Sequence, residues 1–375
     1  MNNPFALVPY ISKDLFCDRE KEMNLIIDYL TNGSNVTLIS PRRFGKTGLI
    51  YRVFDEIKER KIDINTCYVD IYSTDSIESF IKLLAEAVVS KLEKKTAIRK
   101  FFQLIGGIRP LLSYDPITGS PEISITFDTE QEKHFTLRSI FNYLENQDKK
   151  TIVAIDEFQQ IRKYEGVNME ALLRSYIQPL KNVQFLFCGS RKHLMTEMFA
   201  DARSPFYEST RCIYLNKIDR EKYADFIKKM FAKGKKDISD EAINYILDWT
   251  RIHTFYTQSL CNHLFIKSKK NIGLTDVLAS CEQILKENED TYMQWQNLLT
   301  ADQWRYLKAV AKEGSLTQPS ASAFLQKYRI GAPGNSQRLL KSLIDKELIL
   351  DTTDADGNRS YCVYNVFLSK WLEKK

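Results

Sequence analysis

The sequence has few of the residues that build metal sites and disulfide frameworks. It contains four histidines, none in an HxxxH or HExxH pair, and seven cysteines, an odd number without a CxxC pair. Scattered cysteines of this kind are typical of reduced, mostly buried thiols, so we expect a cytoplasmic protein. The same absences argue against a hydrolase whose metal is held by protein ligands alone.

Long apolar runs and flexible tracts are also missing. No stretch approaches the roughly 18 apolar residues that a membrane-spanning helix needs. Met1 to Phe5 lack the basic and apolar regions of a signal peptide. With 14 Gly and 10 Pro in 375 residues, the chain is neither collagen-like nor disordered in composition. We therefore expect two or three folded domains.

Charge of one sign is not strongly in excess. The chain has 54 basic and 48 acidic residues, which gives a net charge of +6. A balance this mild allows nucleic acid as a partner but does not require it.

Short apolar runs alternate with helical patterns in the first half of the chain. The pattern predicts an α/β core at 1–215 with a parallel sheet, because strands covered on both faces read as near-continuous apolar runs. A helix is expected over Met23–Leu30, with Asp18 as its N-cap. The turn-forming residues 115–119 predict a hairpin inserted at about 105–127. The expected strands are at 36–39, 67–71, 152–155, 184–188 and 212–215.

From about residue 216 the strand patterns stop. Apolar stripes with helical spacing predict a small helical lid domain at 216–297. Helical patterns at 301–313, 320–328 and 335–346 then precede two extended pieces, 348–350 and 361–364. Three helices followed by a two-stranded hairpin predict a winged helix-turn-helix at 298–375.

The strongest motif lies between the first strand and the helix that follows it. Residues 40–47 read SPRRFGKT, a phosphate loop of the GxxxxGK[ST] type in which Ser40 replaces the first Gly. In such a loop the backbone N–H groups surround the phosphates, the lysine contacts the β- and γ-phosphates, and the threonine binds Mg²⁺. We expect Lys46 to face solvent before nucleotide binds, and Ser40 to need backbone angles that suit glycine better. The alternative is a chance Gly-Lys-Thr in a basic turn. The candidate nucleotide-binding residues are Ser40, Pro41, Arg42, Arg43, Phe44, Gly45, Lys46, Thr47 and Gly48.

Two further strands end in polar residues. Asp156 and Glu157 follow the apolar run 151–155, and Ser190 follows the run 185–189. In a chain that has a phosphate loop earlier in its sequence, such an aspartate holds Mg²⁺ and such a glutamate activates the attacking water. Thr47 and Asp156 are thus the candidate metal ligands, and Glu157, Lys46 and Ser190 candidate catalytic residues. Taken alone, the Asp-Glu pair could be an ordinary solvated strand end, and the serine could simply cap its strand.

These motifs together resemble a prokaryotic ATPase family described as predominantly archaeal, related to the origin-recognition ATPases and to the AAA+ and STAND classes. The resemblance rests on FCDREKE (16–22), PRRFGKT (41–47), IDEFQ (155–159) and CGS (188–190), and it extends along nearly the whole chain. It implies ATP and Mg²⁺ as cofactors and places Asp18 and Arg19 at the edge of the nucleotide site. The simpler reading of 18–22 is a helix cap with a solvated charge run.

Two departures from the family pattern concern the γ-phosphate. Where the family has Gly-Arg, this chain has Glu208-Ser209, and the nearest arginines are Arg203 and Arg211. Arg211 is the candidate catalytic arginine, although an arginine from another copy could serve instead. His253 matches a family histidine that could approach the phosphates, without the family's flanking Gly and Pro. A lone histidine beside an aromatic pair is more often part of the packing.

The presumed recognition helix of the winged helix carries polar side chains on one face. Amides and basic groups at this position suit contacts to DNA phosphates and bases. Acidic residues at 345 and 347 moderate its charge, and winged helices also dock proteins. The candidate nucleic-acid residues are Asn335, Gln337, Arg338 and Lys341.

The sequence therefore predicts an AAA+/STAND-like ATPase: a P-loop NTPase core, a helical lid and a winged helix. ATP hydrolysis would drive a conformational switch whose output passes to duplex DNA, a protein effector or another copy. The alternative is a nucleotide-gated regulator or DNA-binding adaptor that does not hydrolyse ATP, supported by Ser40 and the missing Gly-Arg.

Overall fold

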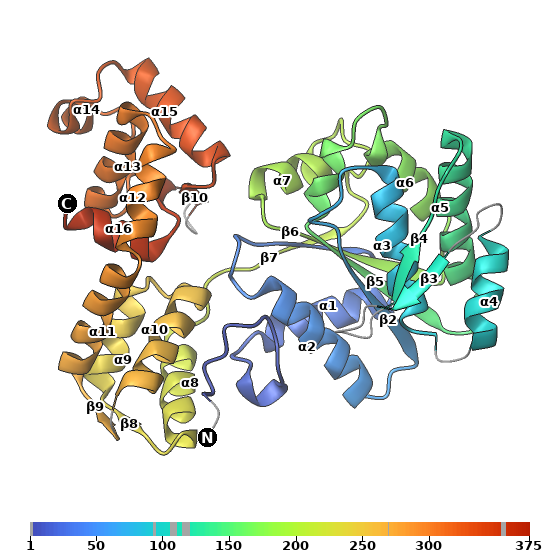
Figure 1. Cartoon of the computed structure of the whole chain (residues 1–375), viewed down its shortest axis with the longest axis horizontal. Helices are drawn as coiled ribbons and strands as arrows, with labels where there is room; N and C mark the ends of the chain where they lie inside the picture. The colour runs from blue at the N-terminus through green and yellow to red at the C-terminus, as the bar shows by residue number, and fades with distance from the viewer. Residues whose placement is uncertain (1–2, 93–94, 106–110, 115–120, 269, 354–357) are drawn as a thin grey trace. The chain divides into compact units, whose positions relative to one another are not determined.

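The computed structural model describes residues 3–92, 95–105, 111–114, 121–268, 270–353 and 358–375 (Figure 1). The chain divides into two compact units: Val8–Lys217, and Met1–Leu7 together with Ile218–Lys375. It therefore passes between the units twice, after Leu7 and after Lys217. Among the described residues, no helix is long and apolar enough to cross a membrane.

The first unit is built on a five-stranded parallel sheet. Its strand order is β2-β5-β6-β1-β7, so β1 lies between β6 and β7. The parallel α/β sheet expected from the sequence is thereby confirmed. The strands are β1 (Val36–Ile39), β2 (Ile64–Asp70), β5 (Lys150–Asp156), β6 (Val183–Gly189) and β7 (Arg211–Tyr214).

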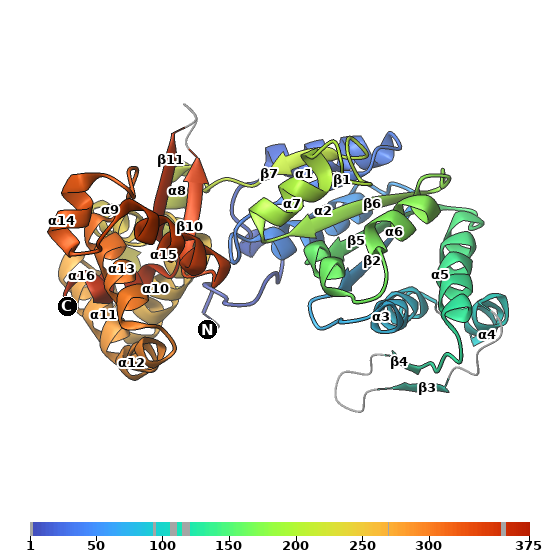
Figure 2. The same cartoon turned by 90° about the horizontal axis from the view of Figure 1, so that it is seen from above.

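Helices cover both faces of this sheet (Figure 2). Along β6, Phe185 and Phe187 belong to one apolar cluster, whereas Leu186 and Cys188 belong to the cluster on the other face. This alternation follows from the two-residue period of a strand. Helices α1 (Glu20–Thr31) and α2 (Lys46–Glu59) contribute to the second cluster. The first cluster is completed by α3 (Ile77–Val89), α5 (Glu130–Glu145), α6 (Met169–Ile177) and α7 (Lys192–Ala200).

The register brings several strand ends to one edge of the sheet. Ile39 lies beside Gly189, and Asp70 lies beside Asp156. Because all the strands are parallel, the segments that follow β1, β5 and β6 meet at this carboxyl edge. The loop before α2, the Asp-Glu pair and Ser190 are therefore neighbours, as the doubly wound fold requires.

The remaining elements of the first unit are peripheral. Short 3-10 helices η1 (Lys13–Leu15) and η2 (Phe158–Lys163) precede α1 and follow Glu157. Helix α4 (Lys95–Leu104) leads to an antiparallel pair, β3 (Leu111–Tyr114) and β4 (Pro121–Ser124). The turn expected at 115–119 lies outside the described residues. Helix α1 begins at Glu20 after Arg19, which has a left-handed backbone, so Asp18 is not the N-cap that the sequence suggested.

The second unit contains a helical region and a winged helix. The helical region holds α8 (Arg220–Lys233), α9 (Asp240–Trp249), α10 (Thr254–Lys267), α11 (Leu274–Glu287) and α12 (Glu289–Asn297). Strand structure does not stop entirely at 216, because β8 (Asp237–Ile238) and β9 (Asn271–Ile272) form a short parallel pair. The winged helix consists of α13 (Ala301–Glu313), α14 (Ser322–Tyr328), α15 (Pro333–Asp345), β10 (Ile349–Thr353), β11 (Arg359–Val363) and α16 (Val366–Glu373).

Helix α16, which the sequence analysis missed, fastens the winged helix to the helical region. Arg251 donates hydrogen bonds to Ser369 Oγ (2.8 Å) and to Glu373 (3.4 Å). The rings of Trp249 and Phe367 lie 5.4 Å apart. An ion pair and aromatic packing at one junction join the two regions into a single unit.

The first residues of the chain pack on the helical region as well. The Phe5 side chain is fully buried, with its ring 4.7 Å from Phe231 and 6.2 Å from Phe265. Asn3 donates to the carbonyl of Asn262 (3.2 Å), and Asn262 donates to the carbonyl of Phe5 (2.7 Å). This exchange of hydrogen bonds holds the segment in place.

Candidate functional site

The loop between β1 and α2 has the curled backbone of a phosphate loop. Arg43 and Gly45 both have left-handed angles, with φ of 62° and 94°. Backbone turned in this way directs successive N–H groups to one side, where an anion can bind. Ser40 has no positive φ, and its N–H donates to the Gly189 carbonyl (3.2 Å). The expectation that Ser40 needs glycine-like angles is therefore wrong, since a side chain fits there without strain.

Lys46, the first residue of α2, is buried between two carboxylates. Its ammonium pairs with Asp156 Oδ1 and lies 3.2 Å from Glu157 Oε1. Only 6% of Lys46 is exposed, so the expectation that it faces solvent is wrong. Burial alone would lower the pKa of Lys46, but the two carboxylates outweigh this effect and raise that pKa. The lysine is therefore charged and paired with both carboxylates.

Asp156 ends β5 with both oxygens in hydrogen bonds. Besides Lys46 it accepts from the Thr47 hydroxyl (2.8 Å) and the Tyr68 hydroxyl (3.2 Å), both at Oδ2. Burial would raise the pKa of Asp156, but the Lys46 ammonium and the Thr47 hydroxyl hold that pKa below its ordinary value. Asp156 is therefore a carboxylate at neutral pH.

The donor set around Asp156 suits a magnesium ion. Thr47 and Asp156 supply oxygen atoms alone, which is the chemistry Mg²⁺ prefers, and this ion commonly takes only one or two protein ligands beside phosphate oxygens and water. Across the described ranges, no group of three or more His, Cys, Asp or Glu side chains could hold a metal. The residues thus fit Mg²⁺ bound together with a nucleotide better than a metal caged by the protein.

Glu157 follows Asp156 with a left-handed backbone, at φ 56° and ψ 39°. Its Oε2 accepts hydrogen bonds from the Ser190 hydroxyl (2.7 Å) and from Gln159 Nε2 (2.5 Å). Ser190 also accepts from Arg42 Nε at 3.4 Å. Ser190, which directly follows β6, thus contacts the candidate base Glu157.

Two side chains of this cluster, Tyr68 and Gln159, were not among the candidates from the sequence. The register places Tyr68 beside Ala154, two residues before Asp156, so the two side chains share one face of the sheet. The signal was the tyrosine within the apolar run of β2, but its use depends on knowing that β2 neighbours β5. Gln159 was visible only as part of the IDEFQ motif.

Gly48 allows the segment before α1 to pack closely against helix α2. A Cβ on Gly48 would lie closer to the Pro9 carbonyl oxygen than real Cβ atoms approach. Beyond Pro9, the Tyr10 hydroxyl donates to Asp55 (2.7 Å), and its ring stacks 6.5 Å from Tyr51. Gly48 is therefore needed for packing of this segment, whatever it contributes to phosphate binding.

Asp18, Arg19 and His253, the other candidates for nucleotide contact, have different surroundings. Arg19 is 4% exposed and donates to Glu22 (2.9 Å) and to the carbonyl of Asn216 (2.5 Å). It ties the start of α1 to the residues after β7, and Asp18 beside it also has a left-handed backbone. His253 belongs to the second unit, where it is buried with its ring 4.6 Å from Tyr256. Their nucleotide contacts stay predictions.

Arg211 begins β7 beside Val36, the first residue of β1. The phosphate loop follows the last residue of β1, so Arg211 lies at the opposite edge of the sheet. Its guanidinium lies 6.0 Å from the centre of the Tyr29 ring. The catalytic role predicted for Arg211 within its own copy does not fit this position, because a parallel strand begins at the edge away from the site.

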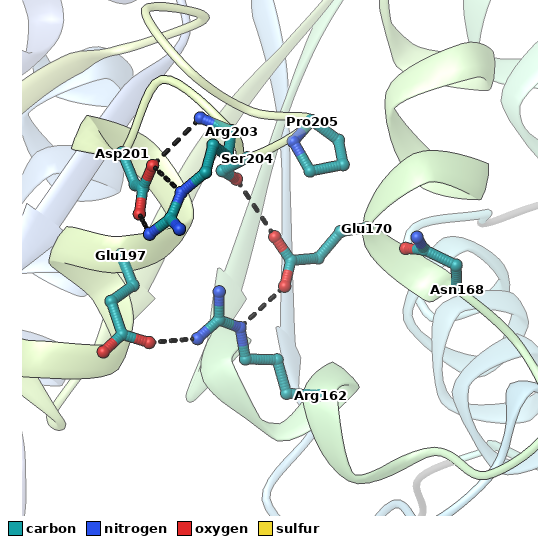
Figure 3. Close-up of a pocket in the computed structure, with 8 residues that line it drawn as sticks. All are labelled: Arg162, Asn168, Glu170, Glu197, Asp201, Arg203, Ser204 and Pro205. Atoms are coloured by element: carbon teal, nitrogen blue, oxygen red, sulfur yellow. Dashed lines mark hydrogen bonds and ion pairs between the residues drawn. The ribbon is translucent and has the colours of Figure 1, made fainter.

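Arg203, the other arginine near the missing motif, lines an open pocket of about 600 Å³ (Figure 3). The charges of this pocket pair with one another: Arg203 with Asp201 (2.7 Å), and Arg162 with Glu170 (2.6 Å) and Glu197 (2.7 Å). The pocket contains none of the phosphate-loop residues. Asn168, Ser204 and Pro205 complete its lining.

The likeness of the chain to known proteins agrees with this geometry. Residues 16–251 match the family described as the ATPase domain predominantly from Archaea. The chain belongs to this family. Residues 290–374 match a probable winged helix domain. No match was found among curated proteins. The resemblance suggested by the motifs is thereby confirmed, and an AAA+-like ATPase domain is joined to a C-terminal winged helix.

Solved structures share the fold of this archaeal ATPase family member at low sequence identity. A Walker-type ATPase of Pyrococcus abyssi has a TM-score of 0.67 and 16% identity, with 98% of this chain and 99% of that chain covered. The Orc2 protein of Aeropyrum pernix (ADPNP–ADP complexes) has a TM-score of 0.59, 13% identity and coverage of 99% and 96%. The Orc1 protein of Aeropyrum pernix in complex with DNA has a TM-score of 0.53, 12% identity and coverage of 100% and 96%.

The winged helix of this family member presents three of the four candidate DNA-contacting residues to solvent. Gln337, Arg338 and Lys341 on α15 are exposed, whereas the opposite face buries Leu339, Leu340 and Leu343. Asn335 is half-buried, donates to the Ile330 carbonyl (2.9 Å) and accepts from Arg338 (2.9 Å). Asn335 thus stabilises the start of α15 and holds Arg338 in place.

Proposed function

We propose that this protein binds Mg·ATP at the loop 40–47 and hydrolyses the β–γ phosphoanhydride bond. The observation that carries the proposal is a single hydrogen-bonded cluster of Lys46, Thr47, Asp156 and Glu157 at the carboxyl edge of the sheet. These residue types come from two separate segments of the chain. Their convergence beside a curled, N–H-rich loop is the arrangement that phosphoryl transfer requires.

Each residue of the cluster has a task that its position supports. The loop N–H groups and the α2 N-terminus bind the phosphates, and Lys46 exchanges its carboxylate partners for phosphate oxygens. Thr47 and Asp156 hold Mg²⁺. When bound, the ion neutralises phosphate charge as it develops during transfer. Glu157 takes a proton from the attacking water, and Ser190 orients the Glu157 carboxylate through its 2.7 Å hydrogen bond.

The charges of the cluster explain why nucleotide and metal should bind together. Without nucleotide, one ammonium offsets two carboxylates, Asp156 and Glu157. If Lys46 turns to a polyphosphate, both carboxylates lose their cation while further negative charge arrives. A divalent cation at Asp156 and Thr47 removes this conflict. We therefore propose Mg·ATP, rather than free ATP, as the ligand.

One observation favours the alternative of a regulator that binds nucleotide without hydrolysing it. Arg211 begins β7 at the edge away from the loop, so it does not supply an arginine to the γ-phosphate of its own copy. Such an arginine contributes about 10³–10⁵ to the rate of related enzymes. Hydrolysis by the isolated protein is therefore expected to be slow, and stimulated by a partner that supplies an arginine. The ordinary backbone of Ser40 removes one argument for this alternative.

Turnover of ATP by the purified protein tests the proposal, with and without duplex DNA. Glu157→Gln keeps the shape of the site but removes the base. We expect the variant to bind Mg·ATP with wild-type affinity and to release phosphate at least a hundredfold more slowly, the scale of a lost general base. Equal rates in the two proteins would remove Glu157 from this role. No turnover by wild type under any of these conditions would support the non-hydrolysing regulator.

We further propose that nucleotide state is communicated to the winged helix and that α15 contacts duplex DNA. The support is the exposed polar face of Gln337, Arg338 and Lys341. A relative of known structure, the Orc1 protein, was solved in complex with DNA. A protein effector, or another copy of the chain, would use the same face if DNA binding is absent.

A further inference from the structure

Gln159 contacts the presumed base Glu157 but has no task in the function proposed above. Its Nε2 donates to Glu157 Oε2 at 2.5 Å, the oxygen that also accepts from Ser190. Gln159 is only 5% exposed. Hydrogen bonds from buried donors to a carboxylate are stronger than those between neutral groups. The orientation of the Glu157 side chain is therefore fixed by two donors on one oxygen, with Oε1 left toward Lys46.

The backbone brings Glu157 and Gln159 together. Glu157 has left-handed angles, and the N–H of Gln160 donates to its carbonyl (2.9 Å), which closes a tight turn at the start of η2. A left-handed conformation is unfavourable for a non-glycine residue. Such strain persists where surrounding contacts hold it. The hydrogen bonds to the Glu157 side chain are contacts of this kind.

Gly189 leaves the space that the Gln159 side chain occupies. A Cβ at this position would lie 2.5 Å from Gln159 Oε1 and would also clash with the thioether of Met195. Gly189 has no positive φ, so backbone freedom does not explain the glycine. The side chains of Met195 and Gln159, which fill the space beside it, do.

The Gln159 amide has no second side-chain task within the described part of the chain. Its Oε1 is buried and has no hydrogen-bond partner there. A buried acceptor left unpaired destabilises the folded protein. If Gln159 served packing alone, an apolar residue of similar length would avoid that cost. Among the described residues, the one side-chain hydrogen bond that Gln159 makes is the one to Glu157.

We propose that Gln159 is a positioning residue for the water-activating carboxylate: with Ser190 it holds Glu157 Oε2, so that Oε1 is directed to the phosphate end of the site. This inference rests on the proposed hydrolysis. Gly189 supports this arrangement, because it leaves room for both Gln159 and Met195. Gln159 itself touches neither nucleotide nor water in this scheme and acts only through Glu157.

The decisive variant is Gln159→Met, which keeps the length of the side chain but removes the N–H donor. The matched control is Gln160→Met. Gln160 is the next residue of η2, and its side-chain amide donates to the Thr74 carbonyl (2.7 Å) instead of to the Glu157 carboxylate. We expect kcat of Gln159→Met to fall roughly 10- to 100-fold, the range for a hydrogen bond to a charged group. KM and the affinity for Mg²⁺ with a non-hydrolysable ATP analogue should stay within about twofold of wild type.

A double-mutant cycle separates positioning from a structural role. Adding Gln159→Met to Glu157→Gln should cause no further loss in single-turnover rate, because the residue acts only through that carboxylate. Additive losses, an equal fall in kcat for Gln160→Met, or a rise in KM at unchanged kcat would each overturn the proposal.

Failure of the proposed hydrolysis can be told apart from failure of this inference. If wild type releases no phosphate under any condition, crystal structures of wild type and Gln159→Met without nucleotide decide the matter. Loss of the Glu157–Ser190 hydrogen bond in the variant would support positioning by Gln159. A Glu157 carboxylate unmoved in the variant would overturn it.

Discussion

Lys46 links the chemistry of the site to the stability of the core. It is buried and paired with Asp156, so its removal leaves a buried carboxylate without a cation. Breaking a buried pair from one side costs more than removing both partners, typically about 3–5 kcal/mol. Mutation of a phosphate-loop lysine is usually read as a loss of ligand binding alone. In this protein the free energy of unfolding should change as well.

Lys46→Met should therefore lose nucleotide binding and also reverse the effect of acid on stability. In wild type the pKa of Asp156 is lowered on folding, so its stabilising contribution is present above the unfolded pKa and is lost as pH falls through the folded value. In Lys46→Met the hydrogen bonds from Thr47 and from the Glu157 N–H remain, but burial, the largest influence on the pKa of Asp156, is no longer opposed by a cation. We therefore expect that pKa to rise above its unfolded value. The variant should then gain stability as pH falls from 7 toward 4.

Urea unfolding midpoints at pH 7 and pH 4 measure this difference. The control is the double variant Lys46→Met, Asp156→Asn, in which neither buried group is charged. It should recover part of the lost stability at pH 7 and show little of the pH dependence. A single variant as stable as wild type at pH 7 would contradict the buried pairing.

The two carboxylates beside Lys46 would repel a bound polyphosphate, and this repulsion leads to a second prediction about single residues. When a chelator removes divalent ions, affinity for ATP should fall about tenfold or more, because the carboxylates of Asp156 and Glu157 are then left beside polyphosphate without a cation. Titration with a fluorescent ATP analogue, with and without Mg²⁺, measures the effect. In Asp156→Asn the dependence on Mg²⁺ should be much smaller. Equal affinities in wild type would show that Asp156 does not hold the ion.

The part of the site that the sequence could predict is the part in which spacing along the chain dictates contact. Lys46 and Thr47 lie in one motif, and Asp156 ends a strand whose neighbours follow from the fold class. The contacts of Tyr68 depend on the strand order, and those of Gln159 depend on a left-handed turn. Neither feature can be read from the sequence. Arg211 was misjudged for a reason that the sequence did hold. A residue that begins a parallel strand lies at the edge opposite to the site.

At the scale of elements, apolar periodicity located the sheet and most of the helices. The burial of β6 on both faces made its run of apolar residues continuous, and this is why it was recognised. Helix α16 was missed because it has only eight residues and follows the wing directly, although Asn365 caps its start. The two-residue strands β8 and β9 are too short to show any period.

The contact of α2 with the segment before α1 leads to a prediction about Gly48. Gly48→Ala should destabilise the protein by about 1–3 kcal/mol, since the new methyl group meets the Pro9 carbonyl and the segment must move. The control is Gly334→Ala in α15, where no atom lies within 4 Å of the added Cβ. That change should be neutral or stabilising by up to about 1 kcal/mol. Thermal unfolding of the two variants measures both effects. Equal losses would rule out the close approach of Pro9 as the cause.

For the whole molecule, the testable question is whether the winged helix reads DNA. If Arg338 and Lys341 each neutralise one phosphate, log affinity for duplex DNA should fall with log salt by about 0.9 for each contact. Replacing both by Ala should reduce the slope by about two contacts and leave ATP turnover without DNA unchanged. Fluorescence anisotropy at several salt concentrations measures the slope. An unchanged slope in the double variant would assign α15 to protein docking instead.

The position of Phe5 has a consequence for how the protein folds during translation. Asn3 and Asn262, which fasten this segment to α10, are 259 residues apart. All five strands of the large sheet are synthesised between them, so the sheet can assemble while the aromatic side chain of Phe5 still lacks its partners Phe231 and Phe265. A folded intermediate of this kind shortens the loop that must later close, and lowers its entropic cost. The unit to which Phe5 and Ile218–Lys375 belong is consequently completed after the sheet during translation.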